Sequence, residues 1–544
     1  MSNEDYYDIG SDSDSDGGSD AENNDELLNS PKLVTIEDLE ELKAKTIDIL
    51  DPTWKIERNK KLILKMLELE EPTITSPMVD FLLQKDASES LISYITQVDS
   101  NLPRPSPTDE HTDEIKLAYK TMMLITSDEP SDGLIDYLGK MATTVAKLSL
   151  RIFEDNSAGS FFHAYRVIEL LARYYPSNVF EALRSDGNVT QRMKSILRYI
   201  GYAPVSELLT MIVGLSTISR LSPLYVACES LRWEFIKDIS EWNFLYKVAQ
   251  IIVNPNKNRV YIKSESDSDS EKADKGRGGY IDLETHSLYA TQLFQECVEK
   301  LSIEDIGELL LQPIGYTPEL LKLFIVTICN DYHDNDDDDD DEEEGDGGNE
   351  TKKEYIDEYK KINASKILYF LLRRAADPEI LCVIGNNGNG MMQQPQCVPN
   401  RLFTLRERII NIVGEYLPII INTIITFDPI QHIKKGEENG KISYIPSGTI
   451  KFSSYEVPTP FTTFRTSLIE LLVILIESDE TLANHLTSQL WELLMNWCLI
   501  YSNNNVYHAL FYRLLFAVLR QNQEIPLKCL LESTTTTTTT SGSN

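Results

Sequence analysis

Apolar residues recur at steps of three and four along most of this chain, a spacing that places them on one side of a helix. The clearest stretch is 461–531, where three apolar segments follow one another with short polar turns between them. The apolar stripe of the first segment consists of Phe464, Leu468, Leu472 and Leu475. The second segment runs from Leu482 to Tyr501. This pattern predicts consecutive helices that pack on one another.

The third segment, Tyr507 to Leu519, is apolar nearly all round apart from Arg513. We therefore expect neighbouring helices to cover it on more than one side. Polar residues at 478–480 and 503–505 supply cap and turn chemistry between the segments. A helix of this kind cannot bury its apolar stripe alone, and stacking against the next helix is the general solution.

The same helical pattern extends through residues 33–254, and strand-like alternation is nearly absent. Gly201 and Pro204 mark a corner between two helices. Residues 409–427 are strongly apolar, but a carboxylate such as Glu415 inside a bilayer costs about 3 kcal/mol. Two short buried helices meeting near Pro418 explain this span better than a membrane helix does. The chain is thus expected to be an all-α helical-repeat solenoid.

Shifts in composition divide the chain into a helical domain with two tails. Residues 1–30 are rich in Ser, Asp, Gly and Asn, which predicts a disordered acidic tail. Residues 532–544 include seven consecutive threonines and predict a second disordered tail. The helical domain spans residues 31–531. Polar, acidic or glycine-rich loops are expected to interrupt it at about 257–282, 331–355, 385–399 and 428–458.

The formal net charge is −35, but much of it is local. Residues 1–30 carry ten Asp or Glu, residues 331–350 carry thirteen, and neither stretch contains Lys or Arg. Removing these 23 charges leaves −12 on the remainder. Phosphate binding needs a basic surface, so nucleic acid is not expected as a partner. Seven scattered cysteines and an acidic start predict a cytoplasmic protein with reduced thiols, with the nucleus as a second compartment.

Catalytic and metal motifs are weak in this sequence. Cys329 and His333 have a Cys-x3-His spacing, but no second pair lies nearby and a closed zinc site needs four ligands. His163 and His508 lie within apolar helical segments, where isolated histidines are usually structural. No nucleophile elbow, zinc-protease or kinase motif is present. We expect neither an enzyme nor a cofactor.

Six serines have an acidic residue three positions later, the context that acidophilic kinases use. They are Ser11, Ser13, Ser19, Ser264, Ser266 and Ser268. Phosphorylation would add about −1.5 to −2 charges at each position and switch contacts with a basic partner. The alternative is a tract that only keeps the chain soluble.

Several short segments resemble the SAPS family, the regulatory subunits of protein phosphatase 6. Tyr199–Leu209 resembles the family's Ile-Gly corner followed by a Leu-Leu-rich helix, and Ala118–Asp128 resembles its Leu-Thr-Ser-Asp helix end. Glu57–Leu62 is similar to its Asn-Lys/Arg-Lys-Leu segment. Residues 400–418 and 463–473 lie where family members have comparable helices. The resemblance follows the family's order through most of 33–531.

The resemblance implies an armadillo-like or HEAT-like scaffold that binds a type 2A-like serine/threonine phosphatase catalytic subunit and directs it to substrates. It also implies a further ankyrin-type regulatory subunit as a second partner. Because Arg is enriched at binding hot spots, four arginines in or beside the matched segments are candidate partner-binding residues. They are Arg198, Arg401, Arg406 and Arg465. Salt bridges between adjacent repeats are the alternative role for each.

Two other classes of function stay open. One is a helical-repeat adaptor in trafficking or transport that binds no phosphatase. The other is an enzyme whose site is assembled from distant residues, which a pocket with three or more convergent titratable side chains would support.

Overall fold

The computed structural model describes residues 52–69, 72–97, 113–154, 157, 159–214, 222–255, 283–329, 349–382, 396–426, 450–451, 456–457, 461–521 and 528. The expected tails at 1–30 and 532–544 and the expected loop at 257–282 lie outside these residues.

Nearly all of the described chain is helical, as the pattern predicted. The α-helices are α2 (Pro52–Glu68), α3 (Ser76–Leu82), α4 (Lys85–Thr96), α5 (Asp113–Ile125), α6 (Asp132–Ser149), α7 (Phe161–Tyr174), α8 (Pro176–Arg184), α9 (Val189–Leu197), α10 (Ala203–Gly214), α11 (Pro223–Glu241), α12 (Phe244–Val253), α13 (Leu283–Leu301), α14 (Gly307–Tyr316), α15 (Pro318–Cys329), α16 (Asn349–Arg374), α17 (Arg406–Gly414), α18 (Leu417–Thr426), α20 (Thr463–Ser478), α21 (Ser488–Ile500) and α22 (Asn505–Arg520). Short 3₁₀ helices are η1 (Leu150–Phe153), η2 (Ser185–Gly187), η5 (Arg401–Leu405) and η6 (Glu480–His485).

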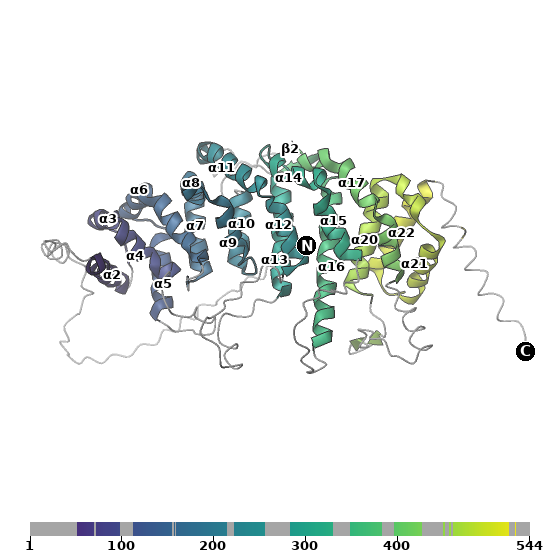
Figure 1. Ribbon diagram of the computed structural model, residues 1–544, viewed down its shortest axis with the longest axis horizontal. Helices are drawn as coiled ribbons and strands as arrows, with labels where there is room; N and C mark the ends of the chain where they lie inside the picture. Colours follow the sequence, from purple (N-terminus) through teal and green to yellow (C-terminus); the bar gives the residue numbers. More distant parts are fainter. Residues whose placement is uncertain are drawn as a thin grey trace, which may run out of the picture.

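The helices stack in three rows along a curved rod (Figure 1). The lower row packs in the order α5, α7, α10, α13, α16, α20 and α22. The upper row runs α3, α6, α8, α11, α14 and then η5 with α17. A middle row contains α12, α15 and α18 and continues to α21, which is drawn below α22 in Figure 1. One hydrophobic core extends from Ile63 to Val518 through all three rows. The chain is therefore an all-α helical-repeat solenoid, in which each helix buries its apolar stripe against its neighbours.

Side-chain caps at the helix starts explain where many of the helices begin. Ser131, Ser160 and Thr462 each accept a hydrogen bond from the backbone N–H three residues on, at the starts of α6, α7 and α20. Asn504, from the second predicted turn, caps α22 in the same way, and Asp479, from the first, caps η6 by accepting the backbone N–H two residues on. Each such cap contributes about 1 kcal/mol. The predicted turn chemistry is confirmed.

The predicted corner at Gly201 and Pro204 is confirmed, because α9 ends at Leu197 and α10 begins at Ala203. The apolar span near Pro418 also forms two short helices, which meet at a bend of 53°. The second apolar segment of 461–531 differs from the prediction of one helix. It is split into η6 and α21 because Thr487 starts a new helix by accepting the Leu490 N–H.

The loop boundaries need three corrections. Helix α16 begins at Asn349, inside the loop expected at 331–355. Strand β2 (Gln396–Pro399) pairs antiparallel with β1 (Glu379–Cys382), so the end of the stretch expected to be irregular at 385–399 is a strand. Strands β3 (Ile450–Lys451) and β4 (Glu456–Val457) pair within the loop expected at 428–458. Such short strands are specified by their partner strand, which a local apolar pattern does not reveal.

A buried ion pair ties the upper and lower rows together. The Arg232 guanidinium on α11 lies 2.6 Å from the Glu304 carboxylate, and the two side chains are only 2% and 6% exposed. Arg232 also donates to the Val213 carbonyl at the end of α10 (3.1 Å) and to the Tyr225 hydroxyl (2.8 Å). Desolvating two charges costs several kcal/mol each, so the pair is stable only because all these partners are in place. It fixes the position of α11 against the turn that leads into α14.

Candidate functional site

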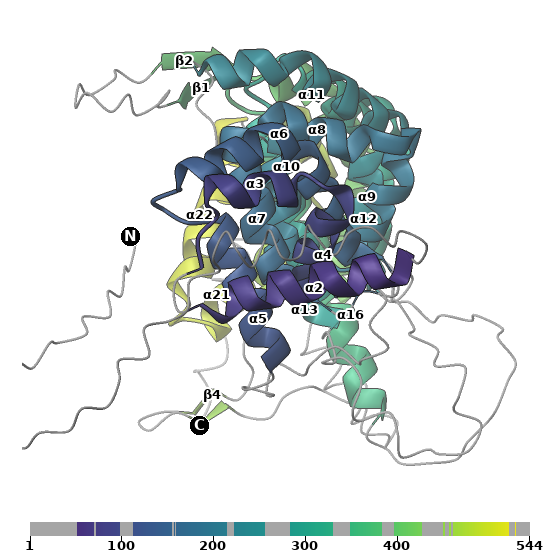
Figure 2. The ribbon, with the colours of Figure 1, turned by 90° about the vertical axis from the view of Figure 1, so that its left-hand side faces the viewer.

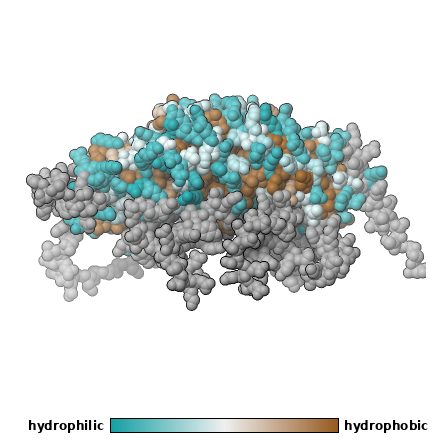
Figure 3. Space-filling view, in the orientation of Figure 1, coloured by the Kyte–Doolittle hydropathy of each residue, from teal (hydrophilic) through white to brown (hydrophobic). Residues whose placement is uncertain are grey.

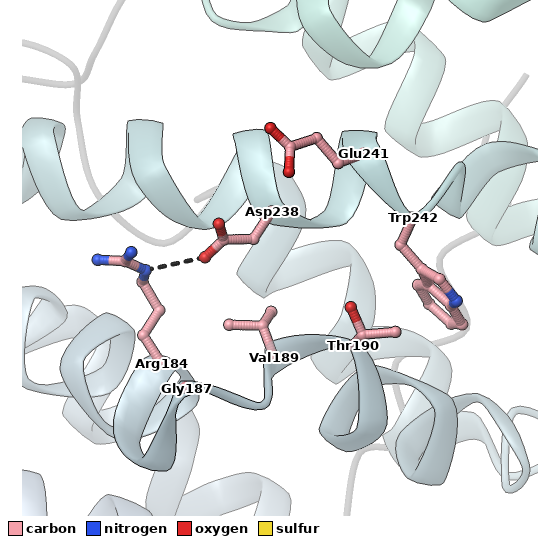
Figure 4. A pocket seen from close by; sticks show the side chains of 7 residues that line it. All are labelled: Arg184, Gly187, Val189, Thr190, Asp238, Glu241 and Trp242. Carbon is pink, nitrogen blue, oxygen red and sulfur yellow. Dashed lines mark hydrogen bonds and ion pairs between the residues drawn. The ribbon is translucent and has the colours of Figure 1, made fainter.

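A pocket of about 450 Å³ opens in the upper row between the end of α8 and the second half of α11. Figure 4 shows α11 crossing above the turn that joins α8 to α9, with Trp242 closing one side of the pocket. The pocket is lined by Arg184, Gly187, Val189, Thr190, Asp238, Glu241 and Trp242. Its walls thus combine an indole ring, small apolar groups and charged side chains.

The turn at the rim of the pocket has an unusual backbone. Asp186 and Gly187 both have positive φ, at 70° and 67°. Gly has no Cβ to oppose this conformation, and Asp tolerates it better than most residues do. Arg192 holds the turn by donating to the Leu183 carbonyl at 2.7 Å, and the hydrogen bond from Lys147 lowers the pKa of Asp186. The rim is therefore held in one shape.

Three ionisable side chains line this pocket, which is the feature that would favour an enzyme. Arg184 Nε and Asp238 Oδ2 lie 3.1 Å apart, and Arg184 also pairs with Glu234. Glu241 projects to the opposite side of α11 from Val189 and Thr190 in Figure 4. Arg184 and Asp238 bond each other and Glu241 lies apart from them, so the three charged groups do not converge on a common point. The arrangement suits the seating of a side chain better than a reaction.

A second feature is an exposed apolar cluster on α5 and α7, which we call the α5–α7 patch. It consists of Tyr119, Met123 and Phe162, each about half exposed. The Tyr119 and Phe162 rings lie 6.2 Å and 5.9 Å from the ring of His163, which is buried between them. Burial lowers the pKa of His163, so the imidazole is neutral near pH 7. Aromatic rings and Met are the side chains most enriched at protein interfaces.

The far end of the solenoid exposes a further apolar stripe on α22. Val506, Tyr512 and Phe516 lie along one side of this helix and are 59%, 54% and 58% exposed. Leu499 and Ile500 at the end of α21 are also exposed. The expectation that α22 is covered on more than one side is therefore wrong within the part of the chain that the structure describes. Helix α20 and its neighbours cover one face, and no described helix follows to cover the other.

The four candidate arginines occupy different environments. Arg198 is partly exposed at the C-cap of α9. Arg401 pairs with Asp305, and Arg406 donates to the Ser478 carbonyl at 3.2 Å. Arg465 is 9% exposed and donates to the Tyr501 hydroxyl at 3.2 Å. The last three thus join neighbouring elements of the solenoid, and a role in partner binding stays a prediction for all four.

The remaining candidate residues form no common site in the described ranges. Cys329 is partly buried at the end of α15, and His333 lies outside the described residues, as do Ser11, Ser13, Ser19, Ser264, Ser266 and Ser268. His508 Nε2 lies 3.2 Å from the Cys498 carbonyl. No group of three or more His, Cys, Asp or Glu suited to a metal ion occurs among the described residues.

The described helices are too short or too polar to span a membrane singly. Two bent pairs, 307–329 and 401–426, have sufficient combined length and apolarity.

Neither the pocket nor the α5–α7 patch was predicted from the sequence. The signal for the patch was present, because Tyr119 and Met123 are four residues apart and lie off the buried stripe of α5 that contains Met122 and Ile125. The pocket had no such signal, since it forms where separate helices meet. No protein-family model matches this chain, and no curated protein matches it in sequence.

Proposed function

We propose that this chain is a non-catalytic scaffold subunit that binds the catalytic subunit of a protein phosphatase 6-type serine/threonine phosphatase and directs its substrate choice or location. The metal-dependent hydrolysis belongs to the partner. The resemblance to the SAPS family further supports an ankyrin-type regulatory subunit as another partner. It also supports a cytoplasmic location, with the nucleus as a second compartment.

One observation carries the proposal. Three of the segments that resemble the family, at 118–128, 199–209 and 463–473, lie far apart in the sequence, yet they contribute to α5, α10 and α20 of the same lower row. A row of stacked helices is the usual binding surface of a solenoid. At α5 this row exposes Tyr119 and Met123, and the neighbouring α7 adds Phe162. The α5–α7 patch is thus our candidate contact for the phosphatase.

The aromatic side chains of the patch set the expected effect of a mutation on binding affinity. Central aromatic residues of protein interfaces commonly cost about 2 kcal/mol or more when they are truncated to alanine. A loss of about 1.4 kcal/mol already weakens binding tenfold. Replacing two such rings is therefore expected to reduce affinity at least about tenfold.

The test uses the full chain and a purified protein phosphatase 6-type catalytic subunit, with binding measured by calorimetry or surface plasmon resonance. Direct binding by the wild type, and a loss of at least about tenfold in Tyr119→Ala/Phe162→Ala, would support the proposal. The matched control is Tyr512→Ala/Phe516→Ala, which removes one Tyr and one Phe of similar exposure from α22.

Equal affinities for the wild type and the α5–α7 variant would overturn the role of the patch. If the purified phosphatase does not bind, and affinity capture recovers coat or transport proteins only, the phosphatase proposal fails and the adaptor is favoured. Far-UV circular dichroism of each variant shows that the helices remain folded.

A further inference from the structure

Helix α2 carries a positive charge that is unusual for this acidic chain. Its 17 residues contain five Lys or Arg against Glu57 and Glu68, a net charge of +3 in a chain whose formal charge is −35. Lys60, Lys61 and Lys65 are exposed, and we call them the lysine face of α2. No described carboxylate forms an ion pair with any of the three.

The glutamates of α2 offset part of the charge of these lysines. Glu57 precedes Lys60 and Lys61 by three and four residues. Glu68 follows Lys65 by three. Lys61 and Lys65 are four residues apart, so their charges lie next to each other on the helix surface. A like-charge pair at this spacing destabilises a helix by a few tenths of a kcal/mol, roughly 0.2–0.5. An anionic partner would turn this repulsion into attraction.

The neighbouring helix α5 places an exposed aromatic ring near α2, which a purely ionic contact would not need. Figure 2 shows α2 lying across the end of the solenoid with α5 next to it. Lys120 of α5 donates to the Leu67 and Leu69 carbonyls at the end of α2, at 2.9 Å and 3.0 Å, which fixes the two helices together. Tyr119, beside Lys120 in sequence, is half exposed. A segment with both carboxylates and aromatic rings would complement these two helices.

The chain itself contains such a segment. Residues 4–26 hold ten Asp or Glu and no Lys or Arg, and they include Tyr6 and Tyr7. We propose that this acidic segment docks in cis on the lysine face of α2. The contact would cover the surface next to the α5–α7 patch, and phosphorylation of Ser11, Ser13 or Ser19 would strengthen it by adding about −1.5 to −2 charges per site.

The length of the connection favours this segment over a separate acidic protein. Residues 27–51 join it to the start of α2, and 25 residues measure about 37 Å even at the short helical rise of 1.5 Å per residue. Helix α2 is itself about 26 Å long, from 1.5 Å per residue, so the whole lysine face lies within reach. Because the segment and the lysine face belong to one chain, their contact forms within the molecule and does not depend on protein concentration. Even a weak ionic contact is therefore populated.

The experiment measures how fast a glutamate-specific protease cuts the full chain after Glu4, Glu22 and Glu26. In Lys60→Gln/Lys61→Gln/Lys65→Gln we expect cutting about three- to tenfold faster than in the wild type, since the ionic contact that shields the segment from the protease is removed. Lys60→Arg/Lys61→Arg/Lys65→Arg keeps the charges and should restore the slow rate. The matched control, Lys194→Gln/Lys237→Gln/Lys366→Gln, removes the same charge from α9, α11 and α16.

Several results would overturn the proposal. One is an equal cutting rate in the wild type and the Gln variant of α2, and another is an equal acceleration in the control. A protection that disappears on dilution would show that the segment binds a second molecule instead of its own chain. In 0.5 M NaCl the wild type should approach the rate of the Gln variant, because surface charges are then screened within a few ångströms. The test uses this chain alone, so its outcome does not depend on whether a phosphatase binds.

Discussion

Helices α20 and α22 have similar apolar sequences and opposite environments. In α20, residues all round the helix are buried, including Leu468, Ile469, Leu471 and Val473. In α22 only one face is buried, and Val506, Tyr512 and Phe516 remain exposed. The sequence pattern predicted the reverse, with a single stripe on the first helix and general coverage of the second.

The difference follows from their positions in the lower row. Helix α20 lies between α16 and α22 and is also touched by α17, α18 and η6. Helix α22 packs on α20, α21 and η6, and no described helix lies beyond it. The number of apolar residues in a helix therefore limits how much apolar surface the helix is able to bury. The position of the helix in the stack decides how much of that surface is buried.

The largest expected contrast is in core truncation. Leu472→Ala in α20 removes a fully buried side chain and should lower the free energy of unfolding by about 2–5 kcal/mol. Phe516→Ala in α22 removes a larger but half-exposed side chain and should cost less than about 1 kcal/mol. Chemical denaturation followed by circular dichroism measures both. Equal losses would mean that the exposed face of α22 is covered in solution.

Replacing one arginine in α20 and one in α22 compares the buried and the exposed helix through their polar contacts. Arg465 of α20 is buried, bonds the Tyr501 hydroxyl and lies 5.8 Å from the Trp497 ring centre. Arg465→Met should cost about 2 kcal/mol, because hydrogen bonds from charged groups contribute roughly 1.5–3 kcal/mol. Arg513 of α22 pairs with Glu477 at the surface, so Arg513→Met should cost less than about 1 kcal/mol.

The thermal midpoints of the two arginine variants provide the measurement. A larger loss for Arg513→Met than for Arg465→Met would contradict the assignment of α20 as the buried helix. It would also return Arg465 to the candidate partner contacts, since its bonds within the chain would then contribute little to stability.

A substitution on the buried face of α22 is expected to change the free energy of unfolding least, and this change depends on pH. The Tyr507 hydroxyl donates to the Leu494 carbonyl at 2.5 Å, and burial raises its pKa above the ordinary value of 10. The folded state thus favours the neutral phenol of Tyr507. The contribution of this phenol to the free energy of unfolding is fully present below pH 10. That stability is lost as the pH rises above 10, where the phenol of the unfolded chain ionises first.

Tyr507→Phe should therefore cost about 1 kcal/mol at pH 7, from the lost hydrogen bond. Between pH 10 and 11.5 its free energy of unfolding should fall less steeply than that of the wild type. Denaturant midpoints measured across this range provide the check. Parallel curves for the two proteins would show that the Tyr507 hydroxyl is accessible to solvent in the folded state.

Some of the fold could be predicted residue by residue. Asp479 and Asn504 cap helices, and Gly201 and Pro204 lie at a corner, because caps and turns depend on residues close in sequence. The strand pair β1–β2 was missed because its two strands are joined only by hydrogen bonds between distant residues. The candidate arginines were chosen from sequence neighbours, yet Arg401, Arg406 and Arg465 all contact elements far along the chain.

By itself, the sequence determined the helical class, several helix ends, and the acidic segments that carry much of the charge, because periodicity, caps and composition are local properties. Only the tertiary structure decided which apolar faces stay exposed, which arginines are buried and where the pocket and the α5–α7 patch lie. These features depend on which helices become neighbours, and in a solenoid each face is covered or left open by the next helix in its row.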